Sequence, residues 1–400
     1  MPSRRDVLFG IGAVGTAAVA GCLGGPSADP GSLESYTWTT SGADRRNSRA
    51  IPDGTAPRDE PTVDWRVEFG SPVATDEPIV TDDTVLVAVG TDVVAFDRET
   101  ADRRWSIDPE NDAYMYRSSP TVFDGTAYVP EVTSLTARDL ETGEIDWSHE
   151  FDTTIGQGSL LVSDGGENGR VFAAGGNYVH ALDAETGDHL WEQELFGTAR
   201  YSLAKYTDYL YVATSGGELY AITRWGAVEW RRTVEAGITS APIALSSSDG
   251  DAGPGVAVAG GDGSITYFGM GGAREWQTEL GGFGDDGLAI AHRTLLARSG
   301  STLHALDPND GSGRWRVDLG RGSNNPPIVV GDTVYLGGDK LRAIDIDGGI
   351  GIRSLRVGEQ RFEHDEDDAV SFVTAADGKL FATTNVERFG DESAELVVLS

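Results

Sequence analysis

Short runs of apolar residues alternate with polar residues along most of the chain, and turn-forming Asp-Gly and Thr-Gly pairs separate many of the runs. Such alternation predicts β-strands with one buried face, whereas no stretch keeps the apolar spacing of an amphipathic helix. Antiparallel strands joined by tight turns would turn four successive runs into one sheet. An example of four such runs is "SSPTVFDG" at 118–125, "TAYVPEV" at 126–132, "SLTARDL" at 134–140 and "EIDWSHE" at 144–150.

A motif with a fixed order of residues recurs over the last two strands of these sets. The copy "ALDAETGDHLW" at 181–191 has an alanine, an aspartate two residues later, a Thr-Gly pair and a tryptophan. From Trp65 onward, the tryptophans of the pattern are 40, 42, 44, 39, 46 and 39 residues apart. A period near 40 residues with strand-like content is typical of a β-propeller. The predicted structural contacts of the motif are Trp105, Trp147, Trp191, Trp230, Trp276, Trp315, Gly143, Gly187 and Gly311.

The number of outer strands predicts eight blades. Seven outer strands carry the tryptophans from Trp65 to Trp315, and an eighth is expected around Leu355, where the motif has no tryptophan. The final segment supplies only three strands, and the strand at 62–69 has no sheet of its own. We therefore predict that 62–69 pairs with 394–400 and closes the ring, which removes exposed sheet edges. The predicted fold is an all-β, monomeric, eight-bladed propeller with four-stranded antiparallel blades.

The chemistry of the motif indicates architecture rather than a ligand site. Indole is a large, flat apolar group with one N–H donor, so it can fill the wedge between two blades if a carbonyl accepts that donor. The alanine leaves room for the ring, the glycine tolerates a positive φ in the turn, and the aspartate can accept backbone N–H groups across it. A ligand site would rarely need the same group six times around a ring, so we interpret the tryptophans as structural.

In these residues the chain resembles the eight-bladed propellers with pyrroloquinoline-quinone-type (PQQ-type) repeats, whose motif is Ala-x-Asp-x-x-Thr-Gly-x-x-x-Trp. The copies at 139–147 and 183–191 match from the aspartate onward, whereas Ala101 replaces the glycine of the first copy. The resemblance implies that each tryptophan docks over its own alanine and against the glycine peptide of the next motif. The segment "WTTSGADRRNSRAIP" from Trp38 also resembles a lead-in segment of this family. The resemblance covers about residues 36–400 and is specific for the fold, but only weakly specific for function.

The N-terminal residues resemble a twin-arginine export signal that ends in a lipobox. Arg4 and Arg5 precede an uncharged run at 7–21, which is too short for an ordinary transmembrane helix. Cys22, the only cysteine, ends this run, where lipidation would anchor the protein to the extracytoplasmic face of the cell membrane. The alternative is an incidental thiol in a discarded signal peptide. The expected domains are a signal at 1–22, a flexible tether at 23–35 and a propeller at 36–400.

The chain is strongly acidic, with 64 acidic and 31 basic residues and a formal net charge of -33. One interpretation is a surface for cations or for a basic partner, and the other is a solvated acidic coat suited to concentrated salt. At molar salt the screening length falls to about 3 Å, which removes most self-repulsion between dispersed acids. We favour the acidic coat, a composition that resembles haloarchaeal proteins. Nucleic acid is not expected as a partner because the sequence has no basic stripe.

Two branches of the resembled family differ in function. In the quinoprotein dehydrogenases the quinone lies in the axial funnel with calcium, commonly above a disulfide of adjacent cysteines. This chain has no cysteine beyond Cys22, and the other branch contains non-catalytic propeller lipoproteins such as BamB. We expect a non-catalytic scaffold that binds an unknown protein partner or ligand and needs no cofactor. The alternatives are a dehydrogenase that uses PQQ and calcium, and a carbohydrate-binding protein that stacks sugars on Tyr114, Tyr116 and Tyr201.

A site in the funnel would be lined where the chain enters the innermost strand of each blade, because eight segments converge there. The acids at 363–369 could hold calcium, but they are more typical of a solvated loop. His180 and His304 directly precede the Ala-x-Asp motif, and we expect these two histidines to pack rather than to bind a metal. The candidate lining residues of the funnel are Glu77, Arg117, Gln157, Arg200, Thr239, Asp285, Asn324 and Asp368.

Overall fold

The structure is a computed structural model, and its compact unit runs over Glu34–Ser400. Every regular element among the described residues is a β-strand, which confirms the all-β prediction. The described residues include no helix that is long and apolar enough to cross a bilayer. Arg4, Arg5, Cys22 and the predicted tether at 23–35 lie outside the described residues. The described residues are 37–69, 76–107, 118–155, 160–163, 169–282, 287–320, 325–352, 355–357, 359–366, 369–388 and 391–400.

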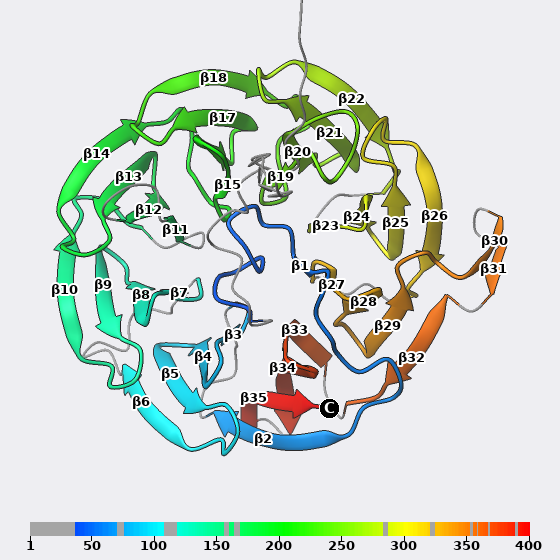
Figure 1. Cartoon of the computed structure of the whole chain (residues 1–400), viewed down its shortest axis with the longest axis horizontal. Helices are drawn as coiled ribbons and strands as arrows, with labels where there is room; N and C mark the ends of the chain where they lie inside the picture. The colour runs from blue at the N-terminus through cyan, green and yellow to red at the C-terminus, as the bar shows by residue number, and fades with distance from the viewer. Residues whose placement is uncertain are drawn as a thin grey trace, which may run out of the picture. The chain divides into compact units, whose positions relative to one another are not determined.

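Eight blades stand around a central axis, as the repeats predict (Figure 1). Within each blade, four antiparallel strands follow one another from the axis to the rim. The first blade is β3 (Ile79–Val80), β4 (Thr84–Val89), β5 (Asp92–Asp97) and β6 (Arg103–Ile107), and the second is β7 (Thr121–Phe123), β8 (Thr126–Pro130), β9 (Ser134–Asp139) and β10 (Ile145–Glu150). The third is β11 (Leu161–Ser163), β12 (Arg170–Gly175), β13 (Tyr178–Asp183) and β14 (His189–Glu194), and the fourth is β15 (Ala204–Tyr206), β16 (Tyr209–Ala213), β17 (Glu218–Thr223) and β18 (Val228–Thr233).

The remaining blades follow the same order, with one added strand in the seventh. The fifth is β19 (Ile243–Leu245), β20 (Gly255–Ala259), β21 (Ser264–Gly269) and β22 (Arg274–Glu279), and the sixth is β23 (Leu288–Ala291), β24 (Thr294–Ser299), β25 (Thr302–Leu306) and β26 (Gly313–Asp318). The seventh is β27 (Ile328–Val330), β28 (Thr333–Leu336), β29 (Leu341–Asp345) and β32 (Gln360–His364), with β1 (Ala50–Ile51) parallel to β27. The eighth is β33 (Ala369–Ala376), β34 (Lys379–Arg388), β35 (Asp391–Leu399) and β2 (Val63–Phe69).

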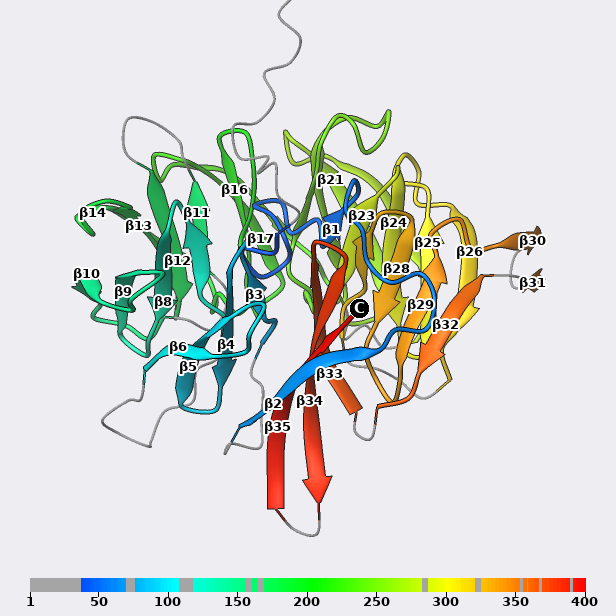
Figure 2. The same cartoon turned by 60° about the horizontal axis from the view of Figure 1, so that its bottom comes forward.

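Strands that are far apart in the sequence complete the eighth blade (Figure 2). β2 pairs antiparallel with β35, so that Val67 lies opposite Leu396. Just beyond this pairing, Thr62 and Ser400 exchange two backbone hydrogen bonds of 2.9 and 3.0 Å. This arrangement confirms the predicted closure of the ring. Each blade therefore has a neighbour on both sides, and no blade at an end of the array leaves an apolar face uncovered.

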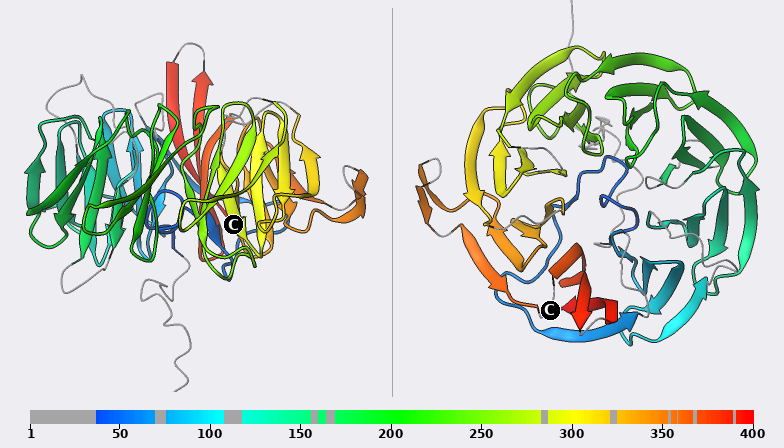
Figure 3. Two further views of the ribbon diagram at one scale, coloured as in Figure 1. Left: turned by 90° about the horizontal axis from the view of Figure 1, so that it is seen from above. Right: turned by 180° about the vertical axis from the view of Figure 1, so that it is seen from behind.

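The outer strand of the seventh blade lies further along the chain than the sequence predicts. Leu355 belongs to a separate hairpin of β30 (Ile350–Ile352) and β31 (Leu355–Val357), which projects from the rim (Figure 3). The outer strand is β32, where Phe362 lies opposite Ala343, as the tryptophans lie opposite alanines elsewhere. The prediction at Leu355 is therefore wrong, because the inserted hairpin has a strand-like sequence of its own.

Each motif tryptophan bridges its own blade and the next. Trp147 lies opposite Ala137 in the sheet, and its indole N–H donates to the carbonyl of Ala184 at 3.0 Å. A Cβ atom on Gly187 would lie 2.6 Å from the Trp147 ring, so this turn position has room only for glycine. Gly143 and Gly311 stand in the same relation to Trp105 and Trp276. Indole N–H groups also meet carbonyl oxygens at 2.7–3.2 Å at Trp65, Trp105, Trp191, Trp230, Trp276 and Trp315.

A β-bulge recurs between the third and fourth strands of every blade. In the third blade Ala181 lies opposite Trp191, but the next residue, Leu182, lies opposite His189. The bulge therefore leaves one residue of the outer strand, Leu190, without an opposite residue. As a result, the side chains two residues before and one residue after each tryptophan share one face of the sheet.

Residues 37–51, which we call the plug, cross the centre of the ring (Figures 1 and 3). The innermost strand of a blade has one edge without a strand partner, and this edge faces the axis. The plug bonds to these edges in six of the eight blades, in the order of the chain. The N–H groups of Val80, Val122, Lys205, Ala244, Ile290 and Val329 donate at 2.5–2.9 Å to the carbonyls of Trp38, Thr39, Arg45, Arg46, Ser48 and Arg49, respectively.

Candidate functional site

A buried carboxylate joins the first blade to the plug. Glu77, just before β3, is buried, and its Oε2 accepts hydrogen bonds from the Trp38 indole N–H and the Gly42 backbone N–H at 3.0 Å each. Its Oε1 forms an ion pair with the guanidinium of Arg49. Both oxygens of this carboxylate therefore have partners in the plug. A cation beside a buried carboxylate stabilises its charged form.

The neighbouring Asp76 links the first blade to the second. Its Oδ1 accepts the Glu77 backbone N–H and its Oδ2 accepts the Ser119 backbone N–H, both at 2.9 Å. The Ser119 hydroxyl donates in turn to the Glu77 carbonyl at 2.5 Å. Burial, together with repulsion from Glu77, raises the pKa of Asp76 to about 6. A carboxyl group that exchanges its proton near neutral pH has the property required of a general acid or base.

The structure describes three of the eight candidate lining residues, and no hydrogen bond or ion pair joins these three to one another. Glu77 is buried beneath the plug, as described above. Arg200 is exposed in the segment before β15. Thr239 donates its backbone N–H to the carbonyl of Ala259 at 3.0 Å. The other candidates, Arg117, Gln157, Asp285, Asn324 and Asp368, lie outside the described residues.

Of the tyrosines proposed to stack on sugars, only Tyr201 lies among the described residues. Its ring is half-buried, and its hydroxyl donates to the carbonyl of Ile238 at 2.7 Å. This bond ties the start of the fourth blade to the start of the fifth. Tyr114 and Tyr116 lie outside the described residues.

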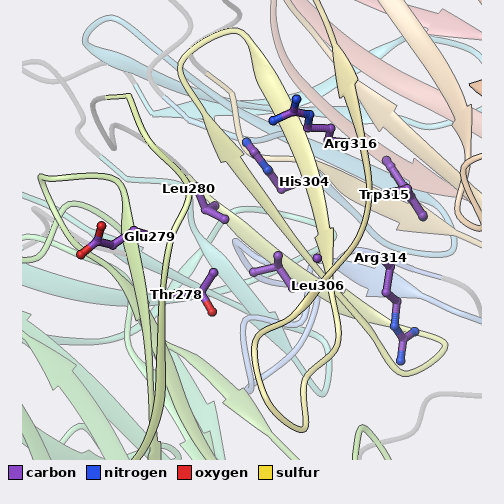
Figure 4. Close-up of a pocket in the computed structure, with 9 residues that line it drawn as sticks. Thr278, Glu279, Leu280, His304, Leu306, Arg314, Trp315 and Arg316 are labelled. Atoms are coloured by element: carbon purple, nitrogen blue, oxygen red, sulfur yellow. The ribbon is translucent and has the colours of Figure 1, made fainter. Parts of the chain in front are cut away.

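A cavity of about 520 Å³ lies at the rim, between the outer parts of the fifth and sixth blades (Figure 4). Burial, followed by the charge of Arg316, lowers the pKa of His304 in its wall to about 4. This neutral imidazole has no nucleophile paired with it in the lining, so we place the candidate site at the ring centre instead. The lining residues are Thr278, Glu279, Leu280, His304, Leu306, Gly313, Arg314, Trp315 and Arg316.

The closed ring of four-stranded blades and the repeated tryptophan motifs define an eight-bladed β-propeller with PQQ-type repeats. A family model described as outer membrane protein assembly factor BamB matches residues 61–164, 156–280 and 261–380. Because these matches span most of the chain, the protein belongs to this family, as its motif predicts. No curated protein matches the sequence.

Several solved structures share the fold. The quinohemoprotein alcohol dehydrogenase from Comamonas testosteroni superposes with a TM-score of 0.71 at 14% identity, over 91% of this chain and 80% of that chain. A europium-containing methanol dehydrogenase gives a TM-score of 0.72 at 12% identity, over 91% and 98% of the two chains. A quinohemoprotein alcohol dehydrogenase from Pseudomonas putida gives 0.70 at 15% identity, over 91% and 80%. At these identities the likeness establishes the fold alone.

These similarities correct two predictions from the sequence, that the protein is not an enzyme and that it needs no cofactor. Three solved structures that match 91% of the chain are alcohol and methanol dehydrogenases, of which two are quinohemoproteins and one contains europium. The prediction against catalysis depended on the absence of a cysteine pair. The absence of one cysteine pair is not sufficient to exclude an enzyme, because activity depends on all residues of a site.

The two carboxylates at the ring centre, Asp76 and Glu77, do not fit a calcium ion. Calcium takes six to eight oxygen ligands. The Oε1 of Glu77 is already paired with the guanidinium of Arg49, and its Oε2 accepts two hydrogen bonds. In this arrangement the acidic pair of Asp76 and Glu77 does not fit a calcium site. Arg200 is exposed in the segment before β15, and an arginine can bind a planar carboxylate through two parallel N–H donors.

Asp76 and the contacts of the plug were not predicted from the sequence. The raised pKa of Asp76 depends on burial and on repulsion from Glu77, and neither is visible in a repeat pattern. The plug binds mainly through backbone carbonyls, which every sequence has. One available signal was the concentration of arginines at Arg45, Arg46 and Arg49 in an otherwise acidic chain.

Proposed function

We propose that the protein is an oxidoreductase that acts at the ring centre, with Asp76 as the proton acceptor. The observation that carries this proposal is the half-buried carboxyl of Asp76 beside the plug, with a pKa of about 6. The substrate class is an alcohol, a choice supported by the alcohol and methanol dehydrogenases that share the fold. A carboxylate whose pKa lies near the working pH removes a hydroxyl proton efficiently.

The neighbours of Asp76 suit this role. Two backbone N–H groups, those of Glu77 and Ser119, fix the orientation of its carboxylate. Each carboxylate oxygen has two lone pairs, so a carboxylate can accept more than one hydrogen bond at each oxygen. The Arg49 guanidinium provides a nearby positive charge where negative charge develops as the hydroxyl loses its proton. A bound quinone would accept the hydride, and Arg200 would hold one of its carboxylates.

Dye-linked turnover tests this proposal. Purified protein is mixed with PQQ, a primary alcohol and an artificial electron acceptor, with and without added calcium. We expect alcohol-dependent dye reduction that rises with pH through about 6, and Asp76→Asn should lower kcat at least about 100-fold. Asp332→Asn, a change at an exposed carboxylate in the turn between β27 and β28, serves as the control and should leave the rate unchanged. Absence of alcohol-dependent turnover, or full activity of Asp76→Asn, would reject the proposal.

Binding of a protein partner is a second candidate function, supported by the match to the BamB family model. We propose that the segments before the innermost strands, including Arg117 and Arg200, contact this partner. Capture from native membranes in concentrated salt should then yield a protein that the Arg117→Ala/Arg200→Ala double variant no longer retains. The thermal midpoint of the double variant should match that of the wild type. Equal capture by both forms would exclude these arginines from the interface.

We further propose that Cys22 anchors the protein to the extracytoplasmic face of the membrane. The supporting observation is the position of the only cysteine directly after a short uncharged run. Incorporation of a labelled lipid into the expressed protein should be lost in Cys22→Ser. Replacement of Arg4 and Arg5 by lysine should leave the precursor inside the cell, and unchanged export of that variant would contradict a twin-arginine signal.

A further inference from the structure

Two histidines and a glutamate share one face of the third blade, at its outer strands. His180 of β13 lies directly opposite Glu192 of β14. The recurrent β-bulge places His189 opposite Leu182, so His189 points to the same face as His180 and Glu192. One ligand atom from each of these three side chains lies within 4.8 Å of the other two. The register of the two strands therefore brings together three groups that commonly bind transition metals.

His180 is the buried member of this group, and its ring has unsatisfied nitrogens. The residue is only 6% exposed, and neither Nδ1 nor Nε2 has a hydrogen-bond partner among the described residues. Burial of polar atoms without hydrogen-bond partners costs free energy. The two unpartnered nitrogens of the His180 ring therefore indicate a ligand that binds to one of them.

The distances within the group suit a shared ion better than direct contact. Nδ1 of His180 lies 3.7 Å, and Nε2 of His189 lies 4.0 Å, from Oε2 of Glu192. Both distances are too long for hydrogen bonds. Ligand atoms around a tetrahedral zinc ion lie roughly 3.3 Å apart, given metal–ligand distances of about 2.0–2.2 Å. The Glu192 side chain is 57% exposed, so its rotation can bring the carboxylate closer to both imidazoles.

Aromatic rings from the second blade support the two histidines. The ring of His149 stacks on His189 with a centroid distance of 6.0 Å and an interplanar angle of 14°. Phe151 lies against His180, with ring centroids 4.8 Å apart. Packing of this kind restricts the orientation of the two imidazoles, which is how residues around a metal site position its ligands.

The sixth blade provides an internal comparison. His304 occupies the same motif position as His180 and is 9% exposed. The residue opposite His304 is Arg316, where the third blade has Glu192, and Gly313 takes the place of His189. Figure 4 shows the side chains of His304 and Arg316 close together in the cavity at the rim. The fold thus accommodates a buried histidine at this position in both blades. Only the third of these two blades has a carboxylate and a second imidazole beside it.

We propose that His180, His189 and Glu192 form a binding site for a divalent transition metal of the zinc class. Two imidazoles and one carboxylate are a donor set that zinc accepts, and they leave a fourth position for water or another ligand. The site lies at the rim, on strands β13 and β14, and is separate from the carboxylates at the ring centre. It is therefore independent of the proposed oxidoreductase function.

Metal titration of the full chain tests this site. Protein stripped with a chelator is titrated with Zn²⁺ by calorimetry and with Co²⁺ by visible absorption, in 1 M NaCl with excess Mg²⁺ to suppress binding to surface acids. We expect one tight site and the absorption of low-coordinate Co²⁺ with nitrogen ligands. His189→Ala and Glu192→Gln alter exposed side chains and should each weaken Zn²⁺ binding at least about 10-fold. His304→Ala, the matched change in the sixth blade, should not alter it.

The outcomes are distinct. Loss of the tight site in His189→Ala and Glu192→Gln, with retention in His304→Ala, supports the proposal. Absence of one-to-one binding in the wild type, or unchanged affinity in His189→Ala, overturns it. His180→Ala removes a buried ring, so its thermal midpoint must be measured to separate loss of the ligand from loss of stability. His189→Ala and Glu192→Gln, which change exposed side chains, therefore decide whether the site exists.

Discussion

Arg49 of the plug forms an ion pair with the buried carboxylate of Glu77, 28 residues further along the chain. The Glu77 side chain is 2% exposed and that of Arg49 is 12% exposed. The same carboxylate also binds the indole of Trp38. This one residue of the first blade therefore holds both ends of the plug at the centre of the ring.

Removal of the Arg49 guanidinium should destabilise the ring. Arg49→Ala leaves the Glu77 carboxylate buried without its cation, which we expect to cost about 3–5 kcal/mol of the free energy of unfolding. The exposed pair of Arg58 and Asp332 offers a control, because Arg58→Ala should cost less than about 1 kcal/mol. Chemical unfolding of the two variants measures the difference, and equal losses would show that the plug ion pair contributes no more than a surface pair.

Asp76 should make stability depend on pH. Its pKa is raised on folding, so the folded state binds this proton more tightly than the unfolded state does. The resulting stabilisation is present below the unfolded pKa of about 4 and is lost as the pH rises through about 6. Between pH 4 and 7 the wild type should therefore lose up to about 3 kcal/mol relative to Asp76→Asn. Unfolding curves of the two proteins across this range test the sign, and parallel pH profiles would contradict the raised pKa.

Two glycines of the second blade separate backbone strain from contact with tryptophan. Gly125 and Gly143 have φ values of 75° and 74°, but a Cβ on Gly143 would lie 2.8 Å from the Trp105 ring, whereas one on Gly125 meets nothing within 4 Å. Gly125→Ala should cost about 1–2 kcal/mol, and Gly143→Ala should cost a further ~1–3 kcal/mol. Thermal unfolding compares them. Similar losses in both variants would mean that the ring of Trp105 moves aside without penalty.

Salt should stabilise the protein at neutral pH. With a net charge of -33, dispersed carboxylates repel one another, and the screening length falls from about 10 Å at 0.1 M salt to about 3 Å at 1 M. We expect the thermal midpoint to rise between 0.1 and 2 M KCl at pH 7. Near the isoelectric point of about 4.3 the same addition should have little effect. A midpoint that responds equally to salt at both pH values would point to a cause other than charge repulsion.

The fold could be predicted because its signal repeats. Each blade needs an aromatic wedge and a tight turn, so the same residues recur at a fixed period. One unassigned strand at the start and a last blade that lacks one strand together imply closure of the ring. The prediction failed locally at Leu355, where an inserted hairpin shifts the outer strand and Phe362 replaces tryptophan. The alternation in "QRFEH" at 360–364, with an aromatic residue at its centre, was the available signal.

The candidate sites could not be predicted to the same extent, because they depend on contacts between different strands. Asp76 acquires its pKa from burial and from Glu77, and its position is fixed by Ser119 of another blade. The group of His180, His189 and Glu192 depends on the β-bulge. Regular alternation along β14 would place His189 on the opposite face from Glu192, so the sequence alone separates residues that the structure brings together.

Closure of the ring also determines when the molecule can be completed during protein synthesis. Thr62, just before β2, bonds to Ser400 just after β35, across 338 residues of sequence. At about 5–20 residues per second, a ribosome needs roughly 17–70 s to make the intervening chain. For all of that time the nascent β2 has no partner in its own sheet, and the earlier blades form only an open arc. The first strand of the ring therefore gains its sheet partner only at the end of synthesis.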